Sequence, residues 1–115
     1  IMQYGMLAGL AHPHISNVLL AIHQAPEQQW GLEAMAELAL MSRSKFAELF
    51  KRTVGQSPGD YVIDWRIAIA KDLLKKNKSV ALVANAVGYE NGSALARVFR
   101  KKLGISPKQW VEKYS

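Results

Sequence analysis

Fifteen lysines and arginines, all placed after position 42, are the side chains of this sequence with the most evident chemistry. The first 42 residues contain three acids and no lysine or arginine, giving a formal charge of −3, whereas residues 43–115 carry +9. Basic charge gathered in one part of a chain attracts a polyanion such as nucleic acid. Cationic surface that only aids solubility gives the same totals, so charge alone leaves both interpretations open.

No other set of side chains has the spacing of a reactive centre. The chain has no cysteine, which excludes a disulfide scaffold, a thiolate metal site, a cysteine nucleophile and an iron–sulfur cluster. His12, His14 and His23 have no carboxylate at ligand spacing, so we interpret them as helix-start or surface residues rather than metal ligands. The sequence shows no Ser/His/Asp arrangement and no phosphate-binding glycine loop. We therefore expect neither an enzyme nor a bound metal or cofactor.

Length and composition are those of one globular domain. Of the 115 residues, 50% are hydrophobic and 21% are charged, which suits a chain that buries its own core. No apolar run approaches the ~18–20 residues of a membrane span, and no signal peptide is visible, so we expect a cytoplasmic chain without membrane contact. The chain begins at Ile1 and not at a methionine, and we expect it to be a piece of a longer protein.

Apolar residues at helical spacing along almost the whole chain predict an all-α fold of about seven helices. The predicted helices cover about 13–24, 32–39, 43–54, 59–76, 80–87 and 92–103, with a short last helix after position 107. Ser42 and Ser79 are predicted N-caps, because a serine hydroxyl accepts from free amides of the first helical turn. Residues 1–12 are apolar and interrupted by glycines, and they resemble the end of an upstream linker or helix more than a core element.

The chain contains an internal repeat. The motif Phe50-Lys51-x-x-x-Gly55-x-Ser57-Pro58 returns 49 residues later as Phe99-Arg100-x-x-x-Gly104-x-Ser106-Pro107. Upstream of it the offset is 48, so the turn of the second copy holds one extra residue. Each copy is a short helix, a turn and a second helix with a basic end, the pattern of a helix-turn-helix unit. We predict two such units, over about 32–52 and 79–103, joined by a connecting helix over about 59–76.

Two helix-turn-helix units favour double-stranded DNA as the partner. Such a unit places its second helix in the major groove, where the base edges can be distinguished. A connecting helix of about 17 residues would be roughly 25 Å long at 1.5 Å per residue. Successive major grooves on one face of DNA lie about 34 Å apart, so the two second helices are predicted to enter adjacent grooves. The alternative is a basic helical module that binds an acidic protein, which needs no matched pair of units.

Over about residues 13–115 the sequence resembles the AraC/XylS family of transcription activators. The resemblance rests on the repeated glycine–serine–proline block and on four further motifs: Leu38-Ala39-x-Met41-Ser42, Phe46-x-x-Leu49-Phe50-Lys51, Arg66-x-x-x-Ala70-x-x-Leu73-Leu74 and Val87-Gly88-Tyr89-Glu90. It implies the homeodomain-like, DNA-binding half of a bacterial regulator that works on the nucleoid and contacts RNA polymerase. The lead-in from His12 to Trp30 resembles a subgroup with an upstream cupin-like sensor domain. Residues 1–12 would then be the linker from that domain, which would hold the small-molecule effector site and the dimer contact.

Three positions depart from the family pattern. Leu40 stands in the first turn where the family often has glycine, which predicts a turn of different shape. Leu95 stands where many members have an aromatic residue, and we expect it to be a core replacement. Gly92 replaces a longer polar side chain early in the second reading helix. One base contact is therefore expected to be missing there, or to be replaced by close approach of the backbone.

Base-reading residues are predicted on the outward faces of the two second helices. Family position implies that Ser44, Ala47 and Glu48 point at base edges, and Gly92, Ser93 and Arg97 are the corresponding candidates in the second unit. Arg97 can bind O6 and N7 of guanine together, unless it clamps a phosphate or an internal carboxylate instead. Glu48 can accept from a cytosine amino group, and its alternative is an ion pair with Lys45 or Arg52 one turn away.

Phosphate contacts are predicted from basic residues near the helix ends and from the helix N-termini. Such contacts position a domain on the duplex without specifying its sequence. Arg43 and Lys45 can reach bases or phosphates, with phosphates favoured, and the free amides near Ser42 and Asn91 can bind a phosphate as helix N-termini do. The full predicted set is Ser42, Arg43, Lys45, Lys51, Arg52, Asn91, Arg100, Lys101 and Lys102.

The remaining prominent side chains are predicted to be structural. Trp30, Trp65 and Trp110 can in principle stack on bases, but each falls at a helix entry or on an apolar stripe, which favours core packing. Arg66 lies among apolar neighbours in the connecting helix. We expect it to bind backbone or to pair with an aspartate, the candidates being Asp60, Asp64 and Asp72.

Overall fold

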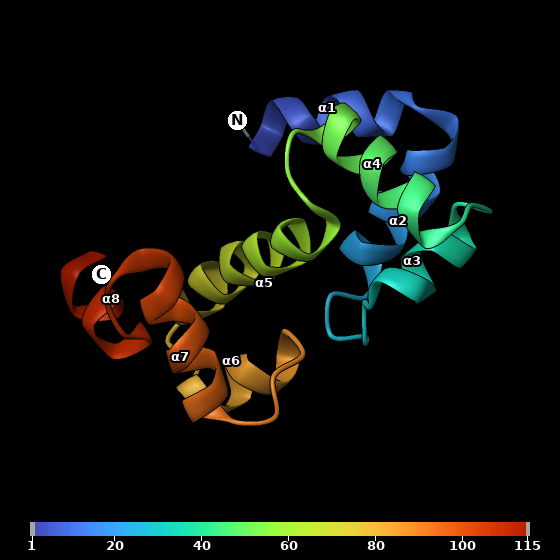
Figure 1. Ribbon diagram of the computed structural model, residues 1–115. Coiled ribbons are helices and arrows are strands. Elements are labelled where there is room, and N and C mark those ends of the chain that lie inside the picture. Colours follow the sequence, from blue (N-terminus) through green and yellow to red (C-terminus); the bar gives the residue numbers. More distant parts are fainter. Residues whose placement is uncertain (1, 115) are drawn as a thin grey trace. The chain divides into compact units, whose positions relative to one another are not determined.

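The computed structural model describes residues 2–114, and the described part folds into eight α-helices without a strand (Figure 1). The helices are α1 (Met2–Ala11), α2 (Pro13–Gln24), α3 (Leu32–Leu38), α4 (Arg43–Val54), α5 (Pro58–Lys75), α6 (Val80–Ala86), α7 (Gly92–Leu103) and α8 (Pro107–Tyr114). The all-α prediction is therefore confirmed. The count exceeds the expected seven by one helix, α1, which occupies the segment expected to be the end of an upstream linker or helix.

The helices belong to two compact units, Ile1–Val62 and Ile63–Ser115. The first unit holds α1 to α4 with the first turn of α5, and the second holds the rest of α5 with α6, α7 and α8. We call them unit 1 and unit 2. Each contains one of the two predicted helix-turn-helix pairs, α3 with α4 and α6 with α7.

The core of unit 1 is built from one face of each helix. Ile15, Val18, Leu19 and Ile22 of α2 are fully buried, as their spacing along one helical stripe predicts. The buried residues of α3 and α4 in the same unit are Met35, Ala36, Phe46, Phe50 and Val54. Tyr61, at the start of α5, is also fully buried, and its ring packs edge-on against Phe50 with 5.8 Å between the centroids.

Helix α1 is part of this unit, which corrects the expectation that residues 1–12 are no core element. It packs against α2 and α4, and Gly5 and Gly9 are buried in the contact. A Cβ atom on Gly5 would overlap the carbonyl of Val54, and one on Gly9 would meet the Leu19 side chain. The glycines that suggested a flexible linker therefore permit close helix packing instead. The origin of the segment in a longer protein stays a prediction.

The core of unit 2 repeats this plan. Its buried residues are Ile67, Ala70, Leu74, Val83, Ala84, Val87, Leu95, Phe99 and Trp110. Trp110 packs edge-on against Phe99 with 6.2 Å between the ring centroids, so its predicted core role is confirmed. Leu95, at a position where many family members have an aromatic residue, is fully buried. Its expected role as a core replacement is confirmed. Trp30 is half-buried, and its Nε1 donates to the carbonyl of Ala25 at 2.7 Å.

Helices α4 and α7 end in the same way. Gly55 and Gly104 have φ of 94° and 80°, a left-handed conformation that ends a helix and that glycine adopts without strain. Their amides donate to the carbonyls of Lys51 and Arg100. The serines that follow cap the next helices: the Ser57 hydroxyl accepts from the Asp60 amide and that of Ser106 from the Gln109 amide. The repeated motif therefore ends one helix and caps the start of the next.

Candidate nucleic-acid interface

The turns that aim α4 and α7 share one hydrogen-bond pattern. In unit 1 the amide of Met41 donates to the carbonyl of Ala36 at 3.1 Å, and in unit 2 the amide of Tyr89 donates to that of Ala84 at 2.8 Å. The residue before each donor is left-handed: Leu40 has φ of 57° and Gly88 has φ of 99°. Leu40 thus follows the same path as glycine, which corrects the expected difference in turn shape.

Leu40 adopts this path at a conformational cost. A residue with a Cβ in the left-handed region is disfavoured by about 1–2 kcal/mol, because its Cβ approaches the following carbonyl oxygen. Its side chain is 86% exposed, so little burial offsets that cost. The extra residue of the second turn, inferred from the change in repeat spacing, is present between Tyr89 and the cap of α7.

Each second helix begins at a polar cap. The Ser42 hydroxyl accepts from the Lys45 amide at 3.3 Å, and the Asn91 side-chain oxygen accepts from the Ala94 amide at 2.9 Å. The predicted N-cap role of Ser42 is thereby confirmed, and that of Ser79 likewise, because its hydroxyl accepts from the Leu82 amide. The contacts of Ser42 and Asn91 with phosphate remain a prediction.

The outward face of α4 carries the predicted contact residues. Phe46 and Phe50 face the core, and the side chains of Arg43, Ser44, Lys45, Glu48, Lys51 and Arg52 are exposed, with Ala47 half-buried between them. Glu48 forms an ion pair with Arg52 at 3.5 Å, and both side chains are largely exposed. A surface pair of this kind contributes about 0–1 kcal/mol, so it yields readily to a base or a phosphate. Both interpretations of Glu48 therefore stay open.

The outward face of α7 is more strongly basic. Leu95 and Phe99 face the core, and the exposed side chains are those of Asn91, Ser93, Arg97, Arg100, Lys101 and Lys102. Gly92 is half-buried, and a Cβ there would lie 3.3 Å from a Val80 methyl group. A side chain at Gly92 would therefore require the Val80 side chain to shift by a few tenths of an ångström, a constraint that the sequence alone did not reveal.

Lys102 differs from the other cations of α7. Its ammonium group pairs with Asp64 of α5 at 3.2 Å, and both side chains are only about one-third exposed. This pair ties the end of α7 to α5, so a phosphate would have to compete with a carboxylate for Lys102. Lys101, one residue earlier, is exposed.

Arg66 contacts an aromatic ring, and two of its three candidate aspartates pair with lysines. The Arg66 guanidinium lies over the Tyr89 ring, 5.2 Å from its centroid, a cation–π contact that fixes the side chain beside the second turn. Asp64 binds Lys102, and Asp72 binds Lys76 at 3.1 Å. An aromatic partner for Arg66 had no counterpart in the sequence interpretation, because Tyr89 is 23 residues away along the chain.

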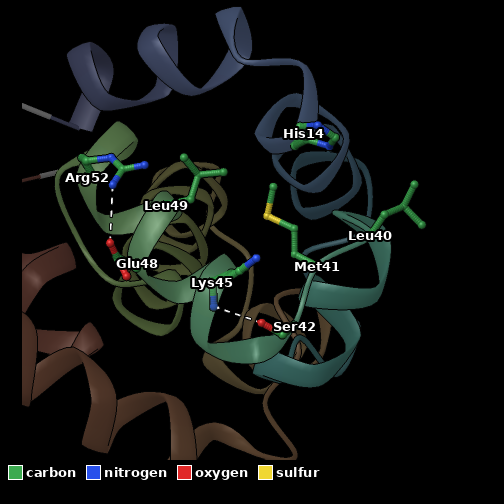
Figure 2. A pocket seen from close by; sticks show the side chains of 8 residues that line it. All are labelled: His14, Leu40, Met41, Ser42, Lys45, Glu48, Leu49 and Arg52. Atoms are coloured by element: carbon green, nitrogen blue, oxygen red, sulfur yellow. Dashed lines mark hydrogen bonds and ion pairs between the residues drawn. The ribbon is translucent and has the colours of Figure 1, made fainter.

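A hollow of about 810 Å³ lies beside α4 in unit 1 (Figure 2). Its lining residues come from the start of α2, the first turn and one edge of α4: His14, Leu40, Met41, Ser42, Lys45, Glu48, Leu49 and Arg52. Sequence reasoning assigned a contact role to Ser42, Lys45, Glu48 and Arg52 and missed the others. His14 carried no recognisable signal, because only the fold brings the start of α2 next to α4.

Unit 1 also contains a part-buried polar pair. The His23 ring nitrogen Nε2 and the Tyr61 hydroxyl are 2.6 Å apart. Burial lowers the pKa of His23, because a charged imidazolium loses its hydration there, and burial raises the pKa of Tyr61 to about 12. The pair links α2 to the start of α5, so its role is to hold unit 1 together.

Within residues 2–114, no three histidine or acidic side chains gather in a way that would hold a metal ion. No helix in this part of the chain has the length and apolar character needed to cross a membrane.

Comparison with known families matches residues 35–113 to a helix-turn-helix domain family. The chain is 41% identical over 104 residues to a putative AraC-like transcription regulator of Streptomyces lividans, covering 90% of this chain and 34% of the relative. It is 40% identical over 105 residues to the transcriptional regulator AlkR of Acinetobacter baylyi, with 90% and 34% covered. The chain belongs to the AraC-type helix-turn-helix family. It spans about a third of the length of these curated relatives.

Solved structures of AraC-type domains share this fold. The DNA-binding domain of the global transcriptional factor AdpA, solved in complex with a target DNA, superposes with a TM-score of 0.80 at 31% identity, covering 86% of this chain and 90% of that one. The C-terminal domain of AraT, a response regulator from Geobacillus stearothermophilus, gives a TM-score of 0.82 at 23% identity, with 89% and 86% covered. The second likeness concerns the fold alone.

Proposed function

We propose that this AraC-type chain binds double-stranded DNA at specific sequences and thereby regulates transcription. The observation that carries the proposal is the matched construction of α4 and α7. Each is aimed by the same turn, starts at a polar cap, buries two aromatic or leucine side chains, and exposes basic and hydrogen-bonding side chains. The AdpA domain, which is bound to DNA in its own structure, supports the same role for this chain.

In the proposed complex α4 and α7 enter adjacent major grooves. Ser44, Ala47 and Glu48 read bases from α4, while Gly92, Ser93 and Arg97 do so from α7. The predicted phosphate contacts supply most of the affinity, because each neutralised phosphate releases counterions. Lys102 is expected to contribute least among them, since its charge is already paired with Asp64.

The wider activity of the full-length regulator is also a proposal. The family resemblance supports a bacterial, cytoplasmic protein that acts on the nucleoid, contacts RNA polymerase and activates transcription. It also supports an upstream domain that binds a small effector and dimerises. We propose a binding role without catalysis for the present chain, because the surface that the family would use carries cations, amides and hydroxyls arranged on helix faces.

Selection of bound duplexes from a random pool, at near-physiological salt, tests the proposed function. We expect two short enriched blocks whose centres lie about 10–10.5 base pairs apart, the separation of adjacent major grooves. Affinity for the selected duplex should fall steeply with added salt. Salt-sensitive binding without an enriched sequence would contradict the proposal and favour a basic module that binds acidic partners.

A further inference from the structure

The hollow beside α4 is lined by both cationic and apolar side chains. This combination suits a polymer in which charged and apolar groups alternate. Lys45 and Arg52 stand on the α4 side, and His14 faces them from the first turn of α2 (Figure 2). Met41 and Leu49, both half-buried, supply the apolar lining. The one carboxylate among its residues, that of Glu48, is already paired with Arg52.

This lining matches the sugar–phosphate backbone of DNA. Phosphate oxygens accept hydrogen bonds from lysine, arginine and imidazole N–H groups, and the deoxyribose between two phosphates presents carbon atoms to apolar side chains. The hollow is open to solvent, which suits an extended polymer better than a small enclosed ligand.

The hollow also lies where a DNA strand would pass if the predicted reading face of α4 contacted the bases. Lys45 and Arg52 are seven residues apart, or about two helical turns, so they lie on one edge of α4 and are separated by roughly 10 Å along its axis. Ser44 and Ala47 lie on the neighbouring face, turned away from that edge. With Ser44 and Ala47 toward the bases, the edge with Lys45 and Arg52 meets one wall of the major groove, and that wall is a phosphate backbone.

Unit 2 carries a cation at the position equivalent to His14. The buried residues Ile15, Val18 and Ile22 of α2 correspond to Ile67, Ala70 and Leu74 of α5, a shift of 52 residues. His14 then corresponds to Arg66, which is held beside the second turn by Tyr89. Both units thus place a side chain of a type that can bind phosphate at equivalent points of α2 and α5, next to the turn.

We propose that the hollow seats the backbone of one DNA strand and that His14 donates a hydrogen bond to a phosphate oxygen there. The proposal rests on the proposed function and adds to it a contact from α2. His14 is a positioning residue on this view: it fixes the duplex against α4 and reads no base.

The test compares the chain with its H14A and H14R variants on the duplex selected by the wild-type chain. We expect H14A to bind about three- to tenfold more weakly, the loss of one charge-assisted contact. We expect H14R to contact the same phosphate and to bind at least as tightly as wild type, with a salt dependence no less steep than that of wild type. Asn17→Ala is the matched control, because Asn17 is exposed one turn later on α2 and does not line the hollow.

Ethylation interference on the same duplex locates the contact. We expect one or two phosphates beside the α4 half-site to lose their interference in H14A and to keep it in N17A. An unchanged pattern and unchanged affinity in H14A would overturn the inference, and so would a changed preference at a base pair. In either case the selected sequence of the wild-type chain still stands, whereas a wild-type chain that selects no sequence refutes the proposed function itself. Circular dichroism of H14A establishes that the variant is folded.

Discussion

The two units share the same plan of helices and turns, and they differ in the side chains that pack on their central aromatic rings. In unit 1 Phe50 packs edge-on against Tyr61, and His23 binds the Tyr61 hydroxyl. In unit 2 Phe99 packs edge-on against Trp110, and Lys75, at the position equivalent to His23, lies over the Trp110 ring at 5.7 Å. The same place is thus filled by an aromatic ring with a polar cover in both units, although the side chains and the kind of contact differ.

The comparison shows which features the fold requires. Helix caps, left-handed stops and the ring at the centre of each core recur because they satisfy backbone groups or fill volume. The outward side chains of α4 and α7 recur only in part. Ser44 corresponds to Ser93 and Lys51 to Arg100, whereas Glu48 corresponds to Arg97 and Lys45 to Ala94. Two units with a common framework and different exposed faces are suited to reading two different short sequences.

The largest effect is expected at the two central rings. If Tyr61 and Trp110 are equivalent, Y61A and W110A should each destabilise their own unit by about 3–5 kcal/mol, since both leave a cavity in a packed core. Chemical denaturation followed through amide signals of each unit measures this. Tyr4→Ala, at an 84% exposed position of α1, is the control and should change stability by less than about 0.5 kcal/mol. A loss of stability in W110A as small as that in Y4A would show that Tyr61 and Trp110 are not equivalent.

The next effect separates reading from positioning on α7. R97A should lose about 1–3 kcal/mol on the preferred duplex and should relax the preference at one base step. K101A should weaken every sequence by a similar factor and should lower the salt slope by about 0.9. Binding curves on the selected duplex and on single-base variants of it distinguish the two outcomes. A uniform loss in both variants would show that the division into reading and positioning residues is wrong.

Much of this fold could be predicted because its signals are local. The stops at Gly55 and Gly104 and the cap at Ser42 each depend on residues a few positions apart, so the sequence contains all that is needed to recognise them. Helix α1 was missed for the opposite reason. Gly5 and Gly9 indicate a flexible segment by themselves, and they permit close packing only because Val54 and Leu19 are brought against them.

The residues of the candidate site also fall into two groups, those that local sequence patterns predict and those that only the fold brings together. The exposed faces of α4 and α7 follow from helical periodicity, so the residues on those faces could be named in advance. His14, the cation–π contact of Arg66 with Tyr89 and the ion pair of Lys102 with Asp64 join residues from different helices. No spacing rule relates such residues, and only the folded chain shows that they meet.

A smaller effect is expected at the turns. Leu40→Gly should stabilise unit 1 by about 1 kcal/mol, because glycine relieves the left-handed strain and the exposed leucine side chain contributes little burial. L40A is the matched control: it removes the side chain but keeps the Cβ, and it should give no such gain. Gly88→Ala should destabilise unit 2 by a similar amount. Urea denaturation of the three variants measures these changes, and an equal gain in L40A and L40G would place the cost in the leucine side chain instead of the backbone.

The smallest expected effect is a pH dependence confined to unit 1. Burial lowers the pKa of His23 in the folded chain, so below the ordinary value of 6.5 the unfolded chain binds a proton more readily than the folded one. The stability that His23 contributes is therefore complete above pH 6.5 and declines as the pH falls below it. Lys75 stands at the equivalent position of unit 2, and unit 2 contains no histidine, so unit 2 should show no matching decline. Unit-resolved hydrogen exchange at pH 7.5 and 5.5 measures the difference, and His23→Gln should reduce it. A decline of equal size in both units, unchanged in H23Q, would mean that another group causes it.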